Sequence, residues 1–240
     1  NLENVTILLA DDLPPREGAE DEFSNIAALT ETTFDDECKI VVYLIGPASR
    51  PAYAAWVTSH EIFHCVQAAN QTPGQLASPA GLGVGGGGNW WLEGAASWFA
   101  ALSVADIGNT RSEVNGFDSS SATTPLNRMA YEASLFFMWL GGEDSPVGVM
   151  RFLKLMAESP DESAQRAAMA AALPQSRWLD FAEAYLDREI RHPHGTDIGL
   201  TPEDGPVWTW SASRVESIDL EPFTIARGTA GFDCGRWRTR

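Results

Sequence analysis

Residues 56–67 read Trp-Val-Thr-Ser-His-Glu-Ile-Phe-His-Cys-Val-Gln and contain two histidines, His60 and His64, four positions apart. On a helix this spacing places both imidazole rings on one face, where they can reach the same ion. Glu61 follows the first histidine, where it can contact a water molecule bound to that ion. The H-E-x-x-H pattern therefore predicts a helix that carries a zinc site, with Glu61 as general base.

The sequence on both sides of the motif supports a long helix. Ser49 can cap its start, Pro51 suits the first turn, and apolar residues at helical spacing continue towards Asn70. Thr72-Pro73-Gly74 then ends the pattern. Two histidines at this spacing can bind one zinc ion only if they lie on a helix, and the surrounding sequence predicts that helix.

Other segments carry equally local signals. In chain order, the sequence predicts strands over 4–10 and 39–45 with a short helix over 23–30 between them, a loop over 71–88, a helix over 90–105, a turn-rich segment over 106–124, helices over 125–141, 146–157, 160–172 and 177–190, a surface turn over 192–195, and short strands over 207–210 and 223–226.

A catalytic zinc site needs three protein ligands, so one more is required. The extended motif H-E-x-x-H-x-x-G-x-x-H places a histidine where this chain has Asn70, which excludes that class. Glu93 is the one acidic residue of the apolar stretch 90–105. A buried glutamate has to be paired, protonated or bound to a metal. Glu93 is therefore the candidate third ligand, with a purely structural hydrogen bond as the alternative.

The motif His60-Glu61-x-x-His64, followed by Trp90-x-x-Glu93-Gly94-x-Ala96, resembles the gluzincin metallopeptidases, in particular their aminopeptidase-N-like branch. The resemblance covers about residues 50–140. It implies a zinc ion held by His60, His64 and Glu93, with Glu61 as base and proton shuttle, and a peptide or protein as substrate.

The resemblance also suggests supporting residues. In the aminopeptidase-like branch a tyrosine of a later helix stabilises the oxyanion, and Tyr131 occupies a similar place here; a role as a core tyrosine is the alternative. In thermolysin-like relatives an acid four residues after the glutamate ligand supports a histidine, and that position is Ser97. Leu92 replaces an asparagine of the family motif, and no Gly-Ala-Met-Glu-Asn segment precedes the motif helix, so an exopeptidase is not implied.

The implied fold is an α+β, zincin-like (thermolysin-like) domain. A small N-terminal β-sheet lies over the motif helix, and the C-terminal half is mostly helical. We expect this domain to span residues 1–204, β-rich over 1–48 and helical over 49–204. Residues 205–240 form a short β-like segment that either packs on the domain or begins a following one.

Composition restricts the partners and the location. A net charge of −17 argues against nucleic acid, and no apolar run is long enough to span a membrane. Cys38 and Cys234 are the more plausible disulfide pair, with Cys65 a buried hydrophobic residue. The chain starts without methionine, as a processed or trimmed chain does, and we expect a secreted or extracytoplasmic protein. The sequence does not predict an oligomeric state.

Two alternatives to an enzyme follow from the same residues. The first is a non-catalytic binding module that holds zinc on a peptidase-like scaffold, favoured by the missing amine-binding segment and the altered sequence after Tyr131. The second is a protein without metal, in which both motifs belong to the core. Metal content and chelator-sensitive cleavage distinguish the three cases.

Overall fold

The computed structural model of the chain describes residues 4–10, 28–32, 37–44, 50–78, 89–105, 107–202, 207–210 and 220–232. Its elements are β1 (Asn4–Ala10), β2 (Ala28–Thr32), β3 (Glu37–Tyr43), α1 (Pro51–Asn70), α2 (Pro73–Ala77), α3 (Asn89–Ser103), α4 (Ile107–Ser120), η2 (Leu126–Arg128), η3 (Tyr131–Ala133), α5 (Ser134–Leu153), α6 (Glu162–Ala172), α7 (Gln175–Leu186), β4 (Val207–Trp210) and β5 (Thr229–Phe232). Helices dominate and two small sheets accompany them, so the structure is mixed and compatible with the predicted α+β class. In the described part of the chain, no helix combines the length and apolarity needed to cross a bilayer.

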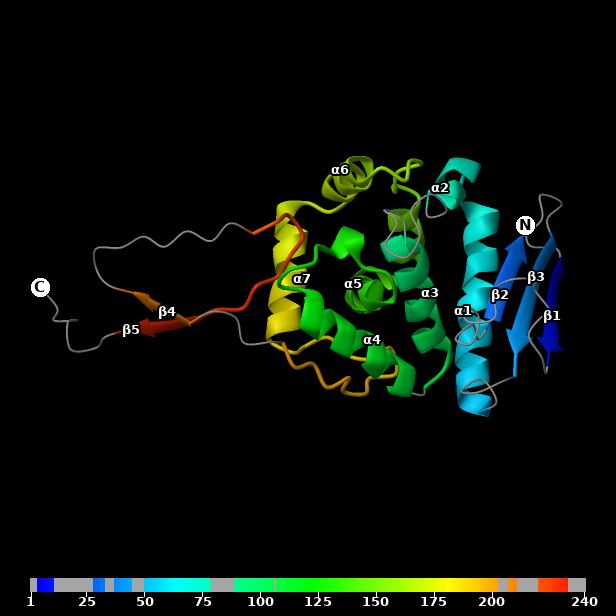
Figure 1. Cartoon of the computed structure of the whole chain (residues 1–240), viewed down its shortest axis with the longest axis horizontal. Coiled ribbons are helices and arrows are strands. Elements are labelled where there is room, and N and C mark those ends of the chain that lie inside the picture. The colour runs from blue at the N-terminus through cyan, green and yellow to red at the C-terminus, as the bar shows by residue number, and fades with distance from the viewer. Residues whose placement is uncertain are drawn as a thin grey trace, which may run out of the picture.

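The N-terminal sheet has three strands in the order β1-β3-β2. Strand β3 pairs with β1 in parallel and with β2 in antiparallel orientation. Alternate residues Cys38, Ile40 and Val42 of β3 are buried in one cluster with Cys65 of α1. The sheet therefore packs its apolar face against the motif helix, as Figure 1 shows at the blue end of the chain.

The disulfide in the structure joins Cys38 of β3 to Cys65 of α1. The predicted pairing of Cys38 with Cys234 is therefore wrong, and Cys65 is buried as a half-cystine instead of a free thiol. Cys234 itself lies outside the described residues. The reason is tertiary: Cys38 points to the helix-covered face of the sheet, and Cys65 lies on the face of α1 that covers it.

Removing this disulfide is expected to lower the free energy of unfolding by about 3 kcal/mol, because the bond closes a loop across 27 residues and restricts the unfolded chain. Urea titration of the zinc-free Cys38→Ala/Cys65→Ala variant measures the loss. Cys234→Ser is the matched control and should unfold as the wild type does. An unchanged free energy of unfolding in the double variant would contradict the pairing.

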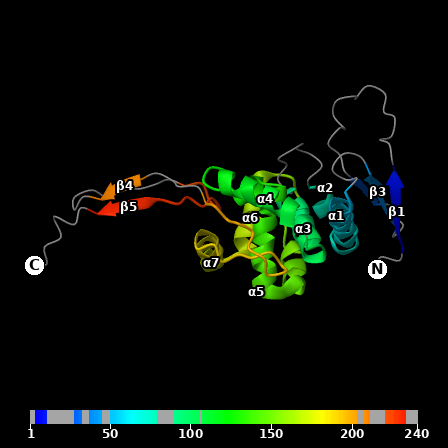
Figure 2. The ribbon, with the colours of Figure 1, turned by 90° about the horizontal axis from the view of Figure 1, so that it is seen from below.

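Helix α3 is the centre of the helical part, with α1 on one side and α5 on the other (Figures 1 and 2). Trp90 is fully buried against the rings of Phe136, Phe137 and Phe152 of α5. At Gly94 the backbones of α3 and η3 approach so closely that an added Cβ would lie 2.8 Å from the Cβ of Ala133. The missing side chain at residue 94 thus lets η3 lie directly on α3.

Several predicted elements differ from the structure. The expected turn-rich segment 106–124 contains the helix α4, whose Thr110, Val114 and Phe117 are buried at helical spacing. The helix expected over 125–141 begins only at Ser134, after two short 3₁₀ turns, and it continues across a kink at Ser145 to Leu153. Packing against the core overrides the polar composition of α4 in the first case. In the second case the non-helical backbone of Ser145 separates two helices that α5 joins, so the predicted helix start at Pro146 is confirmed, although this helix ends at Leu153.

Other corrections are smaller. Of the helix expected over 23–30, residues 28–30 belong to the strand β2, which gains its hydrogen bonds from β3, and the rest lies outside the described residues. The expected loop 71–88 begins with the short helix α2. Arg50 occupies the N-cap position of α1, and Ser49 lies outside the described residues. The segment 223–226 is not a strand; the strand β5 follows it.

The segment after residue 204 contains the predicted strand over 207–210, which is β4, paired in parallel with β5. Both strands lie beyond α7, on the side of the helices opposite to the N-terminal sheet (Figures 1 and 2). The stretch before β5 packs on the helices. The backbone N–H of Ile225 donates to the carbonyl of Ser121, and the carboxylate of Glu221 pairs with Arg128 and Arg166.

Candidate metal centre

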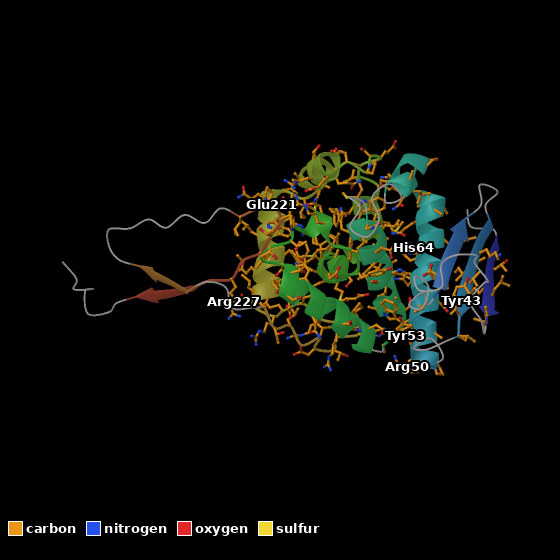
Figure 3. All side chains as sticks on the ribbon, in the orientation of Figure 1. Tyr43, Arg50, Tyr53, His64, Glu221 and Arg227 are labelled. Atoms are coloured by element: carbon orange, nitrogen blue, oxygen red, sulfur yellow. A yellow bond between two sulfur atoms is a disulfide. The ribbon has the colours of Figure 1, made fainter. Side chains whose placement is uncertain are left out.

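The predicted ligands meet where α1 packs on α3. His60 and His64 project from α1, and Glu93 projects from the first turns of α3; in Figure 3, His64 lies between the two helices. The Nε2 atom of His60 is 3.1 Å from Oε2 of Glu93 and 3.1 Å from Nε2 of His64. Nε2 of His64 is 3.6 Å from the same Glu93 oxygen. Three potential metal-ligand atoms thus form one small triangle.

The size of this triangle suits a metal ion. Bonds of 2.0–2.1 Å at tetrahedral angles separate the ligand atoms of a zinc ion by about 3.3 Å. The edges found here are 3.1, 3.1 and 3.6 Å. Two imidazole nitrogens this close need a proton or a cation between them, because their lone pairs repel. His60, His64 and Glu93 can therefore hold a metal ion, and no other group of ligand side chains in the described residues can do so.

Hydrogen bonds orient both histidine rings. Nδ1 of His64 is 2.7 Å from Oε1 of Gln67, whose Nε2 donates to the carbonyl of Leu92 at 3.0 Å. Since the Leu92 carbonyl only accepts, the amide orientation of Gln67 is fixed and its oxygen accepts the Nδ1 proton of His64. Nδ1 of His60 is 3.3 Å from the hydroxyl of Ser97. Both rings thereby turn their Nε2 atoms towards Glu93, as metal-binding histidines require.

Without a metal, the ligands form a charged group. Burial alone would lower the pKa of His64, but the Glu93 carboxylate outweighs it, with help from Glu61 and Gln67, and raises that pKa to about 9. Burial alone would raise the pKa of Glu93, but hydrogen bonds from His60 and His64 hold it well below its usual range. Without a metal, the protonated imidazole of His64 therefore supplies the positive charge of the site.

The two predicted catalytic residues also lie at this site. Glu61 is buried, and its charge acts on both His64 and Tyr131. The ring of Tyr131 lies 5.8 Å from that of His60, and the Tyr131 hydroxyl interacts with Glu93. Burial and the carboxylates of Glu93 and Glu61 raise the pKa of Tyr131 above its usual range, so its hydroxyl stays protonated and able to donate. Half of the Tyr131 side chain remains exposed, unlike a core tyrosine.

Sequence reasoning missed two polar residues near the site. Gln67 is fully buried one turn after His64, and its position on the motif face of α1 was a usable signal. Glu113 comes from α4, which the sequence did not predict, and no local pattern connects it with the motif. His192 and His194 lie in a turn, as predicted, and the backbone N–H of His194 donates to Nδ1 of His192. The prediction of a surface position is wrong for His192, which is buried.

Comparisons with known protein families, with curated proteins and with solved structures found no match to this chain.

Proposed function

We propose that this protein is a zinc-dependent metallopeptidase of the gluzincin type. The observation that carries the proposal is the triangle of His60 Nε2, His64 Nε2 and Glu93 Oε2, whose edges match the spacing of ligands around zinc. Two nitrogens and one carboxylate oxygen leave a fourth position for water, which is the ligand count of a catalytic zinc site. The three-stranded sheet against α1 and the helices beyond it support a zincin-like fold.

The residues around the triangle have the chemistry that hydrolysis of a peptide bond needs. Bound zinc would supply a water of lowered pKa and polarise the scissile carbonyl. Glu61 accepts the proton of that water and delivers it to the leaving amine. Tyr131, whose hydroxyl stays protonated, donates a hydrogen bond to the oxyanion. His60 and His64 are held in the ligand orientation by Ser97 and Gln67.

The same proposal places the protein outside the cytoplasm. The disulfide between Cys38 and Cys65 supports a secreted or extracytoplasmic location, where such bonds persist. Peptide or protein substrates suit that location.

Metal analysis followed by digestion of a broad peptide library tests the function. We expect one zinc per chain and cleavage that stops when a chelator is added and returns with zinc. Zinc without chelator-sensitive cleavage would instead identify a non-catalytic binding module. A metal-free preparation that neither binds zinc nor changes its melting temperature with it would overturn the metal site.

Replacing Tyr131 with phenylalanine is expected to lower kcat by about 10²-fold, because one oxyanion donor is lost, and to leave KM almost unchanged. Steady-state kinetics on one peptide from the library measures both. The matched control is Tyr53→Phe, which removes a hydroxyl about two turns of α1 before His60. Unchanged kcat in the Tyr131 variant would assign that ring to packing.

A further inference from the structure

A cavity of about 500 Å³ lies where α3, α5 and α7 meet the segment that follows α7. Figures 1 and 2 show α5 between the other two helices. The volume falls within the range of about 300–1,000 Å³ that is usual for small-molecule sites. None of the described residues in its wall belongs to the metal centre. The large side chains of the wall are aromatic or aliphatic: Trp98, Leu102, Met138, Trp139 and Ile190.

The wall also contains a buried histidine with an unused donor. His192 is 1% exposed, and its Nε2 atom has no hydrogen-bond partner in the described part of the chain. Its Nδ1 atom accepts the backbone N–H of His194 at 3.3 Å. Burial and the charge of His194 both lower the pKa of His192, so the ring is neutral and carries its proton on Nε2. A buried N–H without an acceptor is unfavourable in a folded protein.

The charges at the cavity do not favour an ionic ligand. Glu189 and Arg191 line it with opposite signs. The guanidinium of Arg191 already donates to the carbonyl of Arg188 at 2.7 Å and lies 3.9 Å from the carboxylate of Asp197. The net charge of −17 adds a field that repels anions. An uncharged molecule therefore suits this cavity better than a carboxylate or an amine.

We propose that this cavity binds an uncharged small molecule with an aromatic or branched apolar body and a carbonyl or amide oxygen. The body packs on the indoles of Trp98 and Trp139, and the oxygen accepts the Nε2 proton of His192. The ligand thus supplies the acceptor that the protein itself does not. This site is additional to the metal centre and does not depend on the proposed zinc function.

Phenylacetamide is the probe, because it joins a phenyl ring to an uncharged amide oxygen. Titration into the whole chain, followed by ¹H–¹⁵N NMR, measures its Kd, which we expect to be about 1 mM, as is usual for a ligand of this size. The resonances of the Trp98 and Trp139 indole N–H groups and of the His192 ring should shift. The Kd should be the same with and without zinc, because the cavity lies outside the metal centre.

Two kinds of variant test the contacts. His192→Phe is expected to weaken binding by about 10-fold, since phenylalanine keeps a ring but has no donor. His194→Phe is the matched control, because it lies in the same turn, outside the cavity wall, and keeps its backbone N–H. Gly142→Leu is expected to weaken binding by at least about 10-fold by filling the cavity; an added Cβ there meets no atom within 4 Å, so the fold should tolerate it. Ala184→Leu fills the cavity from α7.

The outcomes are separable from those of the metal site. The absence of saturable shifts in the wild type would overturn the binding site, whatever the zinc content. Wild-type Kd in His192→Phe would overturn the hydrogen bond to Nε2, and wild-type Kd in both filling variants would overturn the location. Tighter binding of phenylacetate than of phenylacetamide would overturn the assignment to an uncharged ligand. The melting temperature of each variant shows that it is folded, and Ala184→Leu replaces Gly142→Leu if the latter is not.

Discussion

Replacing Glu61 with glutamine is expected to lower kcat for peptide hydrolysis by about 10³-fold or more and to leave zinc bound, because general acid–base catalysis by one residue is worth 10²- to 10⁴-fold and Glu61 serves both proton transfers. The ligand atoms belong to His60, His64 and Glu93, and glutamine has the shape of glutamate. The metal centre should therefore stay intact while the proton acceptor is lost.

Zinc content and kcat of the purified Glu61→Gln protein, measured on the same sample, check this result. Glu143→Gln is the matched control, since Glu143 is exposed on α5, and it should keep both zinc and activity. Retained hydrolysis in Glu61→Gln would remove Glu61 as the base. Loss of zinc in that variant would show that Glu61 supports the ligands instead.

Replacing Glu93 with alanine is expected to weaken zinc binding by at least about 100-fold, more than the 10- to 100-fold loss typical of a partner that only supports a ligand. The two histidines that remain come from one helix and leave the α3 side of the site without a donor. Hydrolysis should fall with metal occupancy, and added zinc should restore it only in part.

A zinc-free measurement on the same variant adds a second readout. Without the Glu93 carboxylate, the pKa of His64 is expected to fall from about 9, because burial lowers it and only the smaller contributions of Glu61 and Gln67 then raise it. Histidine titration by NMR follows this change. Glu93→Gln serves as the isosteric companion and should lose zinc as well. Wild-type zinc affinity in either variant would assign Glu93 to a structural hydrogen bond.

The candidate site could be predicted from the sequence to the extent that it is local. His60 and His64 share a helical face because of their spacing alone, and Glu93 was identified because it is the one acid in an apolar stretch. Glu113 could not be found in this way. Its place near the site depends on how α4 packs on its neighbours, and the sequence of α4 did not predict a helix.

The errors in the fold have the same cause. Gly108, Asn109, Ser112 and other turn-forming residues make α4 look like a loop, yet Val114 and Phe117 bury one side of it in the core. Cys38 gives no sign in the sequence of which cysteine it pairs with, since the choice depends on the face that β3 turns to α1. Tertiary packing decides both features, and it acts over distances that periodicity does not cover.

The bond between Cys38 and Cys65 has a geometric consequence for the metal centre. Cys65 directly follows His64, and successive residues of an α-helix point about 100° apart around the helix axis. Cys65 therefore faces the sheet while His64 faces α3. If α1 could rotate about its own axis, His60 and His64 would move away from Glu93. The disulfide to the sheet fixes that rotation, so both imidazoles face Glu93 before a metal ion binds.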